Sequence, residues 1–248
     1  MNRGGAADWL IGLAVILVSV GPVQAETVHV AVAGNFTAVA EQLAPLFKAQ
    51  TGHEAVYSFG ATGQLYAQIG QGAPFEVLLA ADGDRPAIAV TEGLAVEGTV
   101  FTYAIGALAL YSTSLALDDG EAVLRANGFD KLAIADPEVA PYGRAAVETL
   151  AALDLTEVIT PRLVTGESIS QTLQFVESGN AELGFVAASQ VSGKTGVWLV
   201  PAELYAPIRQ DAVLLKTGQA NPAAAAFLQF LRSDAALDVI EAAGYRVE

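Results

Sequence analysis

The chain has 248 residues, of which 53% are hydrophobic and 16% charged, carries a formal net charge of −15 and contains no cysteine. So acidic a chain is a poor partner for nucleic acids and for anionic membrane surfaces, and its apolar content excludes a disordered protein. Without cysteine it forms no disulfide and carries no lipid on an N-terminal cysteine, so its stability depends on packing.

The first 25 residues have the composition of a secretory signal peptide. Arg3 precedes the almost uniformly apolar stretch 9–20, and Val23-Gln24-Ala25 is a small-x-small cleavage site before Glu26. An apolar stretch of about a dozen residues is shorter than the ~20 that a membrane-spanning helix needs. We therefore expect residues 1–25 to be removed. The mature chain keeps a net charge of −15, because one charge of each sign is lost.

The next part of the chain alternates between strand-like and helical segments. Residues 28–33, apolar except for His29, are typical of a buried parallel strand. Apolar residues at helical spacing predict a helix over 37–50, which Gly52 ends. Strand, helix and strand are expected over 54–59, 64–69 and 77–80. This β-α-β-α-β order predicts a mainly parallel sheet with right-handed crossovers.

The rest of the chain continues the alternation. Strands are expected over 101–111, 132–135, 183–187 and 208–215, and helices over 143–153, 170–177, 223–231 and 234–243. If the chain leaves the first domain near 101–105 and returns near 206–211, the two crossings form a hinge beside a ligand cleft. We therefore expect a discontinuous lobe I, residues 26–104 and 208–248, and a lobe II, residues 105–207.

Four strand-like runs end at short turns of small or neutral polar residues that lead into a helix. The turns are 33–37 (Ala-Gly-Asn-Phe-Thr), 59–63 (Phe-Gly-Ala-Thr-Gly), 141–143 (Pro-Tyr-Gly) and 167–170 (Glu-Ser-Ile-Ser). A helix N-terminus presents unpaired N–H groups and a partial positive charge, so several meeting at one point would form an anion site without Lys or Arg. The alternative is that these residues are ordinary N-caps.

In an anion site each turn would contribute a neutral donor. Asn35 offers a carboxamide N–H pair, Thr62 a hydroxyl and a backbone N–H, and Tyr142 either its phenol O–H or its backbone N–H. Ile169 has only its backbone N–H to offer. Hydrogen bonds to a charged group contribute ~1.5–3 kcal/mol each. Six or seven of them would offset the several kcal/mol needed to desolvate a dianion.

Motifs for other chemistries are incomplete. Residues 189–195 resemble the end of a phosphate-binding P-loop, but Ala188 stands where the first Gly is required. The turn around Ser168 lacks the last Gly of a nucleophile elbow. The two histidines, His29 and His53, occupy positions typical of structural or solvated residues, and a metal site needs clustered ligands. We expect no catalytic residue, no cation site and no cofactor.

Further short motifs follow one another in a characteristic order. They are Gly72-Ala-Pro, Ala81-Asp82, Asp136-Pro137 before Pro141-Tyr142-Gly143, and Leu183-Gly-Phe-Val. With these motifs and the four turns, the chain from about residue 28 to 245 resembles the periplasmic molybdate-binding proteins of ABC importers. The resemblance implies an α/β, two-lobed type II periplasmic binding protein fold with mixed, mainly parallel sheets and a two-stranded hinge.

The resemblance also implies which residues hold the oxyanion. In that family neutral donors from both lobes bind it, and the matching positions here are Gly34, Asn35, Thr62, Tyr142 and Ile169. Three positions depart from the family pattern. Gly34 offers only its backbone where some relatives carry a hydroxyl, Tyr142 stands where Ala is common, and Ala187 replaces a tyrosine that binds in many members.

The function implied is to bind molybdate, and tungstate, between the lobes in the periplasm and to deliver it to the membrane permease of an ABC transporter. A monomer without catalytic activity or membrane insertion is expected. Two alternatives remain: a binding protein for another tetrahedral oxyanion such as sulfate, and an exported hydrolase that uses carboxylates such as Asp136 and Glu138. The preferred oxyanion, and the choice between the phenol and the backbone N–H of Tyr142, stay open.

Overall fold

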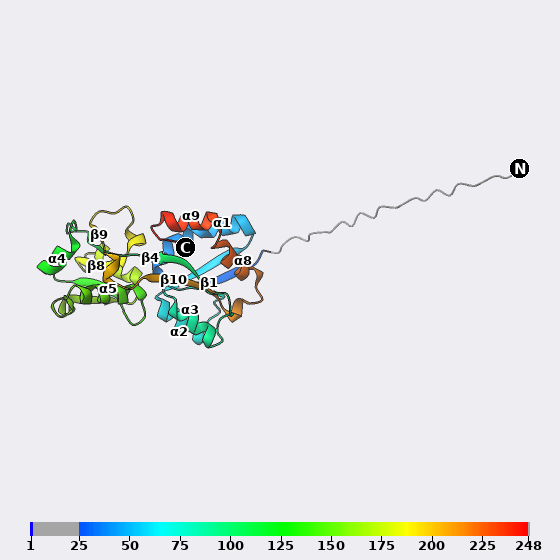
Figure 1. Ribbon diagram of the computed structural model, residues 1–248, viewed down its shortest axis with the longest axis horizontal. Coiled ribbons are helices and arrows are strands. Elements are labelled where there is room, and N and C mark those ends of the chain that lie inside the picture. Colours follow the sequence, from blue (N-terminus) through cyan, green and yellow to red (C-terminus); the bar gives the residue numbers. More distant parts are fainter. Residues whose placement is uncertain (2–24, 248) are drawn as a thin grey trace.

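The computed structural model describes Met1 and residues 25–247, so residues 2–24 of the expected signal peptide lie outside the described residues. The chain forms two α/β lobes that lie side by side (Figure 1). Each lobe is built on one five-stranded sheet. We call the part that contains the first sheet lobe I and the part that contains the second sheet lobe II.

Lobe I has the strand order β2-β1-β3-β10-β4. β1 is parallel to β2 and β3, whereas β10 is antiparallel to β3 and β4. The strands are β1 (Thr27–Ala33), β2 (Glu54–Gly60), β3 (Val77–Leu79), β4 (Phe101–Gly106) and β10 (Ile208–Leu214). The helices are α1 (Thr37–Thr51), α2 (Thr62–Gly70), α3 (Asp84–Thr91), α8 (Pro222–Phe230) and α9 (Asp234–Ala242), with 3-10 helices η1 (Gly34–Phe36) and η5 (Lys216–Gly218). Helices α1, α8 and α9 cover one face of the sheet and α2 and α3 the other (Figure 1).

Lobe II has the strand order β7-β6-β8-β5-β9. β6 is parallel to β7 and β8, whereas β5 is antiparallel to β8 and β9. The strands are β5 (Leu108–Tyr111), β6 (Leu132–Ala135), β7 (Leu163–Gly166), β8 (Leu183–Ala187) and β9 (Val197–Leu199). The helices are α4 (Gly120–Ala126), α5 (Pro141–Ala152), α6 (Thr156–Ile159) and α7 (Ile169–Glu177), with η2 (Thr160–Arg162), η3 (Ala188–Val191) and η4 (Ala202–Leu204). The predicted α/β class with mixed sheets is confirmed. Each sheet contains two parallel and two antiparallel pairings, so parallel pairing does not predominate as expected.

The apolar run 101–111 forms two strands in different sheets. β4 ends at Gly106 in lobe I and β5 begins at Leu108 in lobe II, so the chain crosses between the lobes at Ala107. It returns to the first sheet at Ile208, where β10 begins. The boundary expected after residue 104 therefore falls inside β4. Because Ala104–Gly106 and Leu108–Tyr111 are all buried or nearly so, the hydropathy of the run carries no signal of the crossing.

Most predicted helices are present, with small changes at their ends. α5 begins at Pro141, two residues before the predicted start, because proline suits the first helical position. α1 ends as predicted at Gly52, whose φ of 76° lies in the left-handed region. Helices α3 and α4 were not predicted, because helices of only 8 and 7 residues show little periodic pattern. Pro86 falls in the first turn of α3, where a missing N–H breaks no helical bond.

The two lobes are packed against each other in this structure. Ala33, Ala61 and Ala81 of lobe I belong to the same buried apolar cluster as Tyr142 and Ile169 of lobe II. Among residues 25–247, no helix is long and apolar enough to cross a membrane.

Candidate anion-binding site

A small cavity of about 10 Å³ lies between the lobes, where the carboxyl ends of parallel strands from both sheets face each other. Strands β1, β2 and β3 lead into it from lobe I, and β6 and β7 lead into it from lobe II. Its lining residues are Ala33, Gly34, Asn35, Gly60, Ala61, Thr62, Ala81, Ala140, Pro141, Tyr142 and Ile169. All five predicted site residues therefore meet at one point. A cavity of this size excludes sugars and peptides.

The lining carries no charged side chain, and three of the helices that begin there have no side-chain cap. The residues that precede η1, α2 and α5 are Ala33, Ala61 and Ala140, and none of them accepts a hydrogen bond from its helix. Alanine is a poor N-cap because it has no acceptor. By contrast, Asp119, Asn221 and Ser233 cap α4, α8 and α9. In α2 and α5 the N–H groups of Gly63 and Gly143 are bonded to Val139 O and Ala140 O, so the N–H groups left for another acceptor are the earlier ones, those of Thr62 and Tyr142.

Thr62 presents a hydroxyl proton to this cavity. Its side chain is almost fully buried, and its Oγ1 accepts a hydrogen bond of 3.0 Å from the backbone N–H of Ala81. Among the described residues no acceptor for the hydroxyl's own proton is found. A hydroxyl that accepts one hydrogen bond keeps its own proton to donate, so Thr62 retains a donor at the edge of the cavity.

Asn35 is also buried, but the carboxamide N–H groups that were expected to bind an anion are bonded within the protein. The two N–H bonds of Nδ2 go to Gln210 Oε1 at 2.8 Å and to Tyr245 Oη at 3.0 Å. The phenol of Tyr245 in turn donates to the backbone carbonyl of Asn35 at 2.8 Å. The carboxamide therefore fixes the turn at the end of β1, and the backbone N–H of Asn35 is the donor left for an anion.

On the side of lobe II, Tyr142 and Ile169 both lie in the first turn of a helix. The phenol oxygen of Tyr142 accepts a hydrogen bond of 3.1 Å from Gln210 Nε2. α7 is capped by Ser168, whose Oγ accepts from the N–H of Gln171 at 3.3 Å. This cap leaves the N–H of Ile169 for another acceptor, as the sequence analysis expected for a residue with an apolar side chain.

Hydrogen bonds join the lobes on both sides of the cavity. On one side Gly63 N donates to Val139 O at 2.9 Å and Arg85 Nη2 donates to Glu138 O at 3.1 Å. On the other side Ser170 Oγ donates to Gly34 O at 3.2 Å. A Cβ on Gly34 would lie 2.8 Å from Ser170 Oγ, so this glycine gives the lobes room to close. The structure is therefore that of a closed cleft.

Three buried phenols, those of Tyr103, Tyr142 and Tyr245, belong to the hydrogen-bond network of Asn35 and Gln210. Burial raises the pKa of Tyr103 and of Tyr142 well above the ordinary value, and the neighbouring phenol of Tyr245 adds to both shifts. Burial also raises the pKa of Tyr245 to about 12, while a hydrogen bond from Ser189 acts in the opposite direction. The neutral, donating form of each phenol is thus favoured throughout the physiological range.

These shifts predict a loss of stability at alkaline pH. A phenol whose pKa is raised on folding contributes stability that is present below its unfolded pKa of about 10 and is lost as pH rises towards the folded value. For Tyr245 the loss should fall between pH 10 and about 12. We expect the urea midpoint of the protein to decrease over this range, and to decrease less in Tyr245→Phe. A midpoint that stays constant there would contradict the assignment.

The alternative chemistries find no support in the geometry. Asp136 and Glu138 do not line the cavity, and Asp136 Oδ1 accepts from the N–H of Glu138 in a local turn. Lys194 of the P-loop-like segment pairs with Glu177 at 2.5 Å, and strand β9 follows it instead of the helix that a P-loop requires. Arg144 pairs with Asp84 across the lobes at 3.4 Å and also lies outside the lining.

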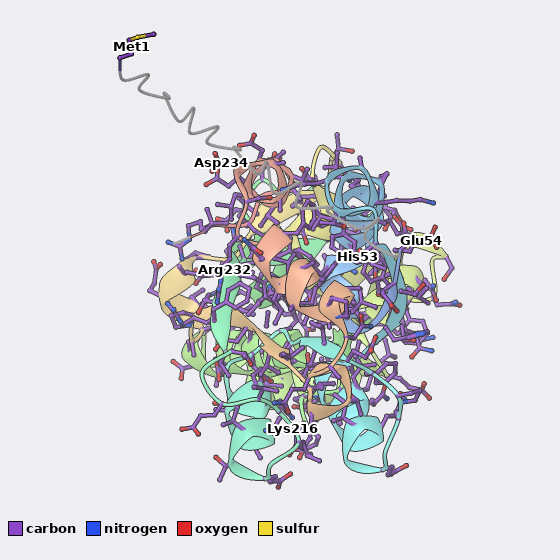
Figure 2. The ribbon with its side chains drawn as sticks, turned by 90° about the vertical axis from the view of Figure 1, so that its right-hand side faces the viewer. Met1, His53, Glu54, Lys216, Arg232 and Asp234 are labelled. Carbon is purple, nitrogen blue, oxygen red and sulfur yellow. The ribbon has the colours of Figure 1, made fainter. Side chains whose placement is uncertain are left out.

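The histidines likewise have structural surroundings. His53 lies just before β2 in lobe I (Figure 2), where its Nδ1 accepts from the N–H of Glu26 at 3.1 Å and its ring stacks on Phe47. His29 lies within β1. Among residues 25–247 no group of three or more His, Asp or Glu side chains is arranged to hold a metal ion.

The residues that hydrogen-bond to Asn35 and Tyr142 were not predicted from the sequence. Gln210, Tyr103 and Tyr245 are buried, and their hydrogen bonds connect Asn35 with Tyr142. The one local signal was a glutamine in an otherwise strand-like run. Its partners lie up to 175 residues away in the chain, so only the tertiary structure could identify them.

Comparison with known proteins gives a consistent result. Residues 28–246 match the family described as bacterial extracellular solute-binding protein. The chain is 52% identical to the molybdate-binding protein ModA of Rhodobacter capsulatus, a match that covers 99% of this chain and 97% of that protein. It is also 52% identical to ModA of Azotobacter vinelandii, over 91% of this chain and 92% of that protein.

The solved structures agree. A periplasmic molybdate-binding protein of Azotobacter vinelandii superposes with a TM-score of 0.85 at 39% sequence identity, covering 89% of this chain and 99% of that one. Sequence and structure thus match over almost the whole described chain. The chain belongs to the bacterial extracellular solute-binding proteins and, among them, to the family of the molybdate-binding proteins ModA.

Proposed function

We propose that this protein binds molybdate, and tungstate, as the intact dianion between its two lobes, and that it delivers the anion to the permease of an ABC transporter. One observation carries the proposal. An uncharged cavity of about 10 Å³ is lined by helix starts whose preceding residue is alanine. The names of the relatives at 52% identity support molybdate in particular.

The donors on offer suit a tetrahedral oxyanion. Lobe I provides the backbone N–H groups of the turn at Gly34 and Asn35 together with the hydroxyl of Thr62. Lobe II provides the N–H groups of Tyr142 and Ile169 and the phenol of Tyr142. Each hydrogen bond to a charged oxygen contributes about 1.5–3 kcal/mol. Because no cation faces the cavity, none is left unpaired when the ligand departs.

Selectivity follows from the donor-only lining. A protonated phosphate carries an O–H that would find no acceptor among these groups, so it binds less well than a fully deprotonated dianion. Sulfate has the same charge as molybdate but is smaller, so donors fixed for the larger anion would reach it less well. The preference for molybdate over sulfate therefore rests on the radius of the closed cavity.

The two lobes open and close about two links, one at Ala107 between β4 and β5 and the other just before β10. The anion favours the closed form because it contacts donors from both lobes only there. Its role is that of a binding protein without catalysis, which the solute-binding family and the names of its relatives support. Its place of action is the periplasm, and it works as a monomer.

Calorimetric titration with molybdate, tungstate, sulfate and phosphate tests the proposal. We expect tight binding of molybdate and tungstate and much weaker binding of the other two anions. Molybdate at about 100 times its dissociation constant should stabilise the fold by about 2.7 kcal/mol and raise the melting temperature accordingly. Tight binding of sulfate without any heat from molybdate would overturn the assignment in favour of another oxyanion.

A further inference from the structure

Gln210 occupies the centre of the polar network behind the cavity. It lies on β10 at an irregularity in the pairing with β4, and its side chain is completely buried. Its Oε1 accepts from Asn35 Nδ2 at 2.8 Å and from Tyr103 Oη at 3.1 Å. Its Nε2 donates to Tyr142 Oη at 3.1 Å. One side chain of lobe I thus contacts a turn of lobe I and a phenol of lobe II.

Gly106 provides the space for this contact. A Cβ at this position would lie 2.1 Å from Tyr142 Oη and 2.6 Å from Gln210 Nε2. Gly106 is not among the glycines with positive φ, so its backbone does not require glycine. Glycine is instead needed at the end of β4 because the amide of Gln210 and the phenol of Tyr142 meet over it.

The contacts of Gln210 determine the direction of the hydrogen bond to Tyr142. Two donors converge on Oε1, which leaves the N–H bonds of Nε2 to face the phenol. The phenol oxygen therefore accepts from Gln210, and its single proton is directed elsewhere.

The hydroxyl of Tyr245 is close enough to affect the pKa of Tyr142. The hydroxyl of Tyr142 also lies near enough to hydrogen-bond the Tyr245 oxygen, where it competes with Asn35 Nδ2 and Ser189 Oγ for the same neutral acceptor. An oxyanion in the cavity is then the stronger acceptor for the proton of Tyr142.

We propose that Gln210 is a positioning residue that makes the phenol of Tyr142 a hydrogen-bond donor to the bound oxyanion. The proposal rests on the proposed function, because it assigns the donor of that same site. It decides between the two possibilities that the sequence left open for Tyr142. It also provides a direct link between the hinge strand β10 and the anion, since the phenol is held correctly only when α5 of lobe II meets β10.

A double-mutant cycle with Tyr142→Phe and Gln210→Met separates this role from a structural one. Methionine fills a similar volume but cannot hydrogen-bond. Loss of one hydrogen bond to a charged ligand corresponds to a decrease in affinity of about 10-fold to 150-fold. We expect Tyr142→Phe to weaken oxyanion binding by such a factor and Gln210→Met to weaken it by about 10-fold. In the Tyr142→Phe background, Gln210→Met should change the affinity by less than about threefold.

The cycle is measured by calorimetry with whichever oxyanion the wild-type protein binds, so a failure of the molybdate assignment is seen separately. If Gln210→Met weakens binding by the same factor in both backgrounds, it acts through Asn35 or the fold and the proposal is wrong. It is also wrong if Gln210→Met leaves the affinity of the wild-type background unchanged.

A matched control variant tests whether a loss of stability alone weakens oxyanion binding. Thr149 is a fully buried residue of α5, the helix that carries Tyr142, and its Oγ1 donates to Ala145 O at 2.8 Å. It does not line the cavity. Thr149→Val should lower the melting temperature of the ligand-free protein, as Gln210→Met does, but leave the affinity for the oxyanion unchanged. A comparable affinity loss in this control would show that the cycle reports only on stability.

Discussion

Asn35→Asp is expected to reduce the affinity for molybdate by at least about 1,000-fold. The carboxamide is bonded to Gln210 and Tyr245, so the new carboxylate acts on the anion from farther than contact distance. Two unit charges about 8 Å apart repel each other by about 2 kcal/mol at an effective dielectric constant of about 20, and a tenfold change in affinity corresponds to about 1.4 kcal/mol. The ligand carries two negative charges. The substitution also replaces the donor Nδ2 by an acceptor that faces Gln210 Oε1 and Tyr245 Oη. Calorimetric titration of the variant measures the loss.

The control for charge alone is Asn180→Asp. Asn180 lies in an exposed turn after α7, away from the cavity lining. The Asn180→Asp substitution adds the same charge as Asn35→Asp. It should change the affinity by less than about twofold, because an exposed charge beyond a Debye length is screened. Wild-type affinity in Asn35→Asp would mean that Asn35 neither faces the anion nor fixes the turn that does.

Thr62→Val is the second change with a large expected effect. It removes the hydroxyl that accepts from the N–H of Ala81 and whose own proton has no acceptor within residues 25–247. The loss of one hydrogen bond to a charged ligand should weaken binding by about 10-fold to 150-fold. The N–H of Ala81 is also left unpaired in a buried place, which should cost the fold about 1–3 kcal/mol.

Thr62→Ser separates the two effects of that substitution. Serine keeps the hydroxyl and loses only a methyl group, so the affinity should stay within about threefold of the wild-type value while stability decreases slightly. Calorimetry gives the affinity, and thermal unfolding without ligand gives the stability. If Thr62→Ser weakens binding as much as Thr62→Val, shape rather than the hydroxyl matters at this position.

Much of the architecture could be predicted from local patterns. The strands at 132–135 and 183–187 are continuous apolar runs and that at 28–33 is apolar except for the exposed His29, because strands covered by helices on both faces are largely buried. The helix ending at Gly52 has a clear apolar face and a stop signal. Short helices such as α3 contain too few turns for a periodic pattern, and the crossing at Ala107 lies within one apolar run.

The candidate site, too, could be predicted from the sequence only in part. The four turns were found because small and neutral polar residues after an apolar run are typical of strand-to-helix connections, and their residues do line one cavity. Whether these residues bind the anion stays a prediction. The sequence could not show that the carboxamide of Asn35 is used within the protein, because its partners Gln210 and Tyr245 lie at the far end of the chain.

The sequence by itself determined that this is an acidic, cysteine-free α/β protein whose turns offer neutral donors at helix starts, since composition, hydropathy and turn chemistry are local properties. The tertiary structure decided which of those donors remain available. Closing the lobes brings three alanine-preceded helix starts to one cavity and commits the side chain of Asn35 to Gln210. It also places Gln210 against the phenol of Tyr142 over Gly106. A hydrogen bond between residues so far apart in the chain exists only after the chain has folded, so no local pattern can encode it.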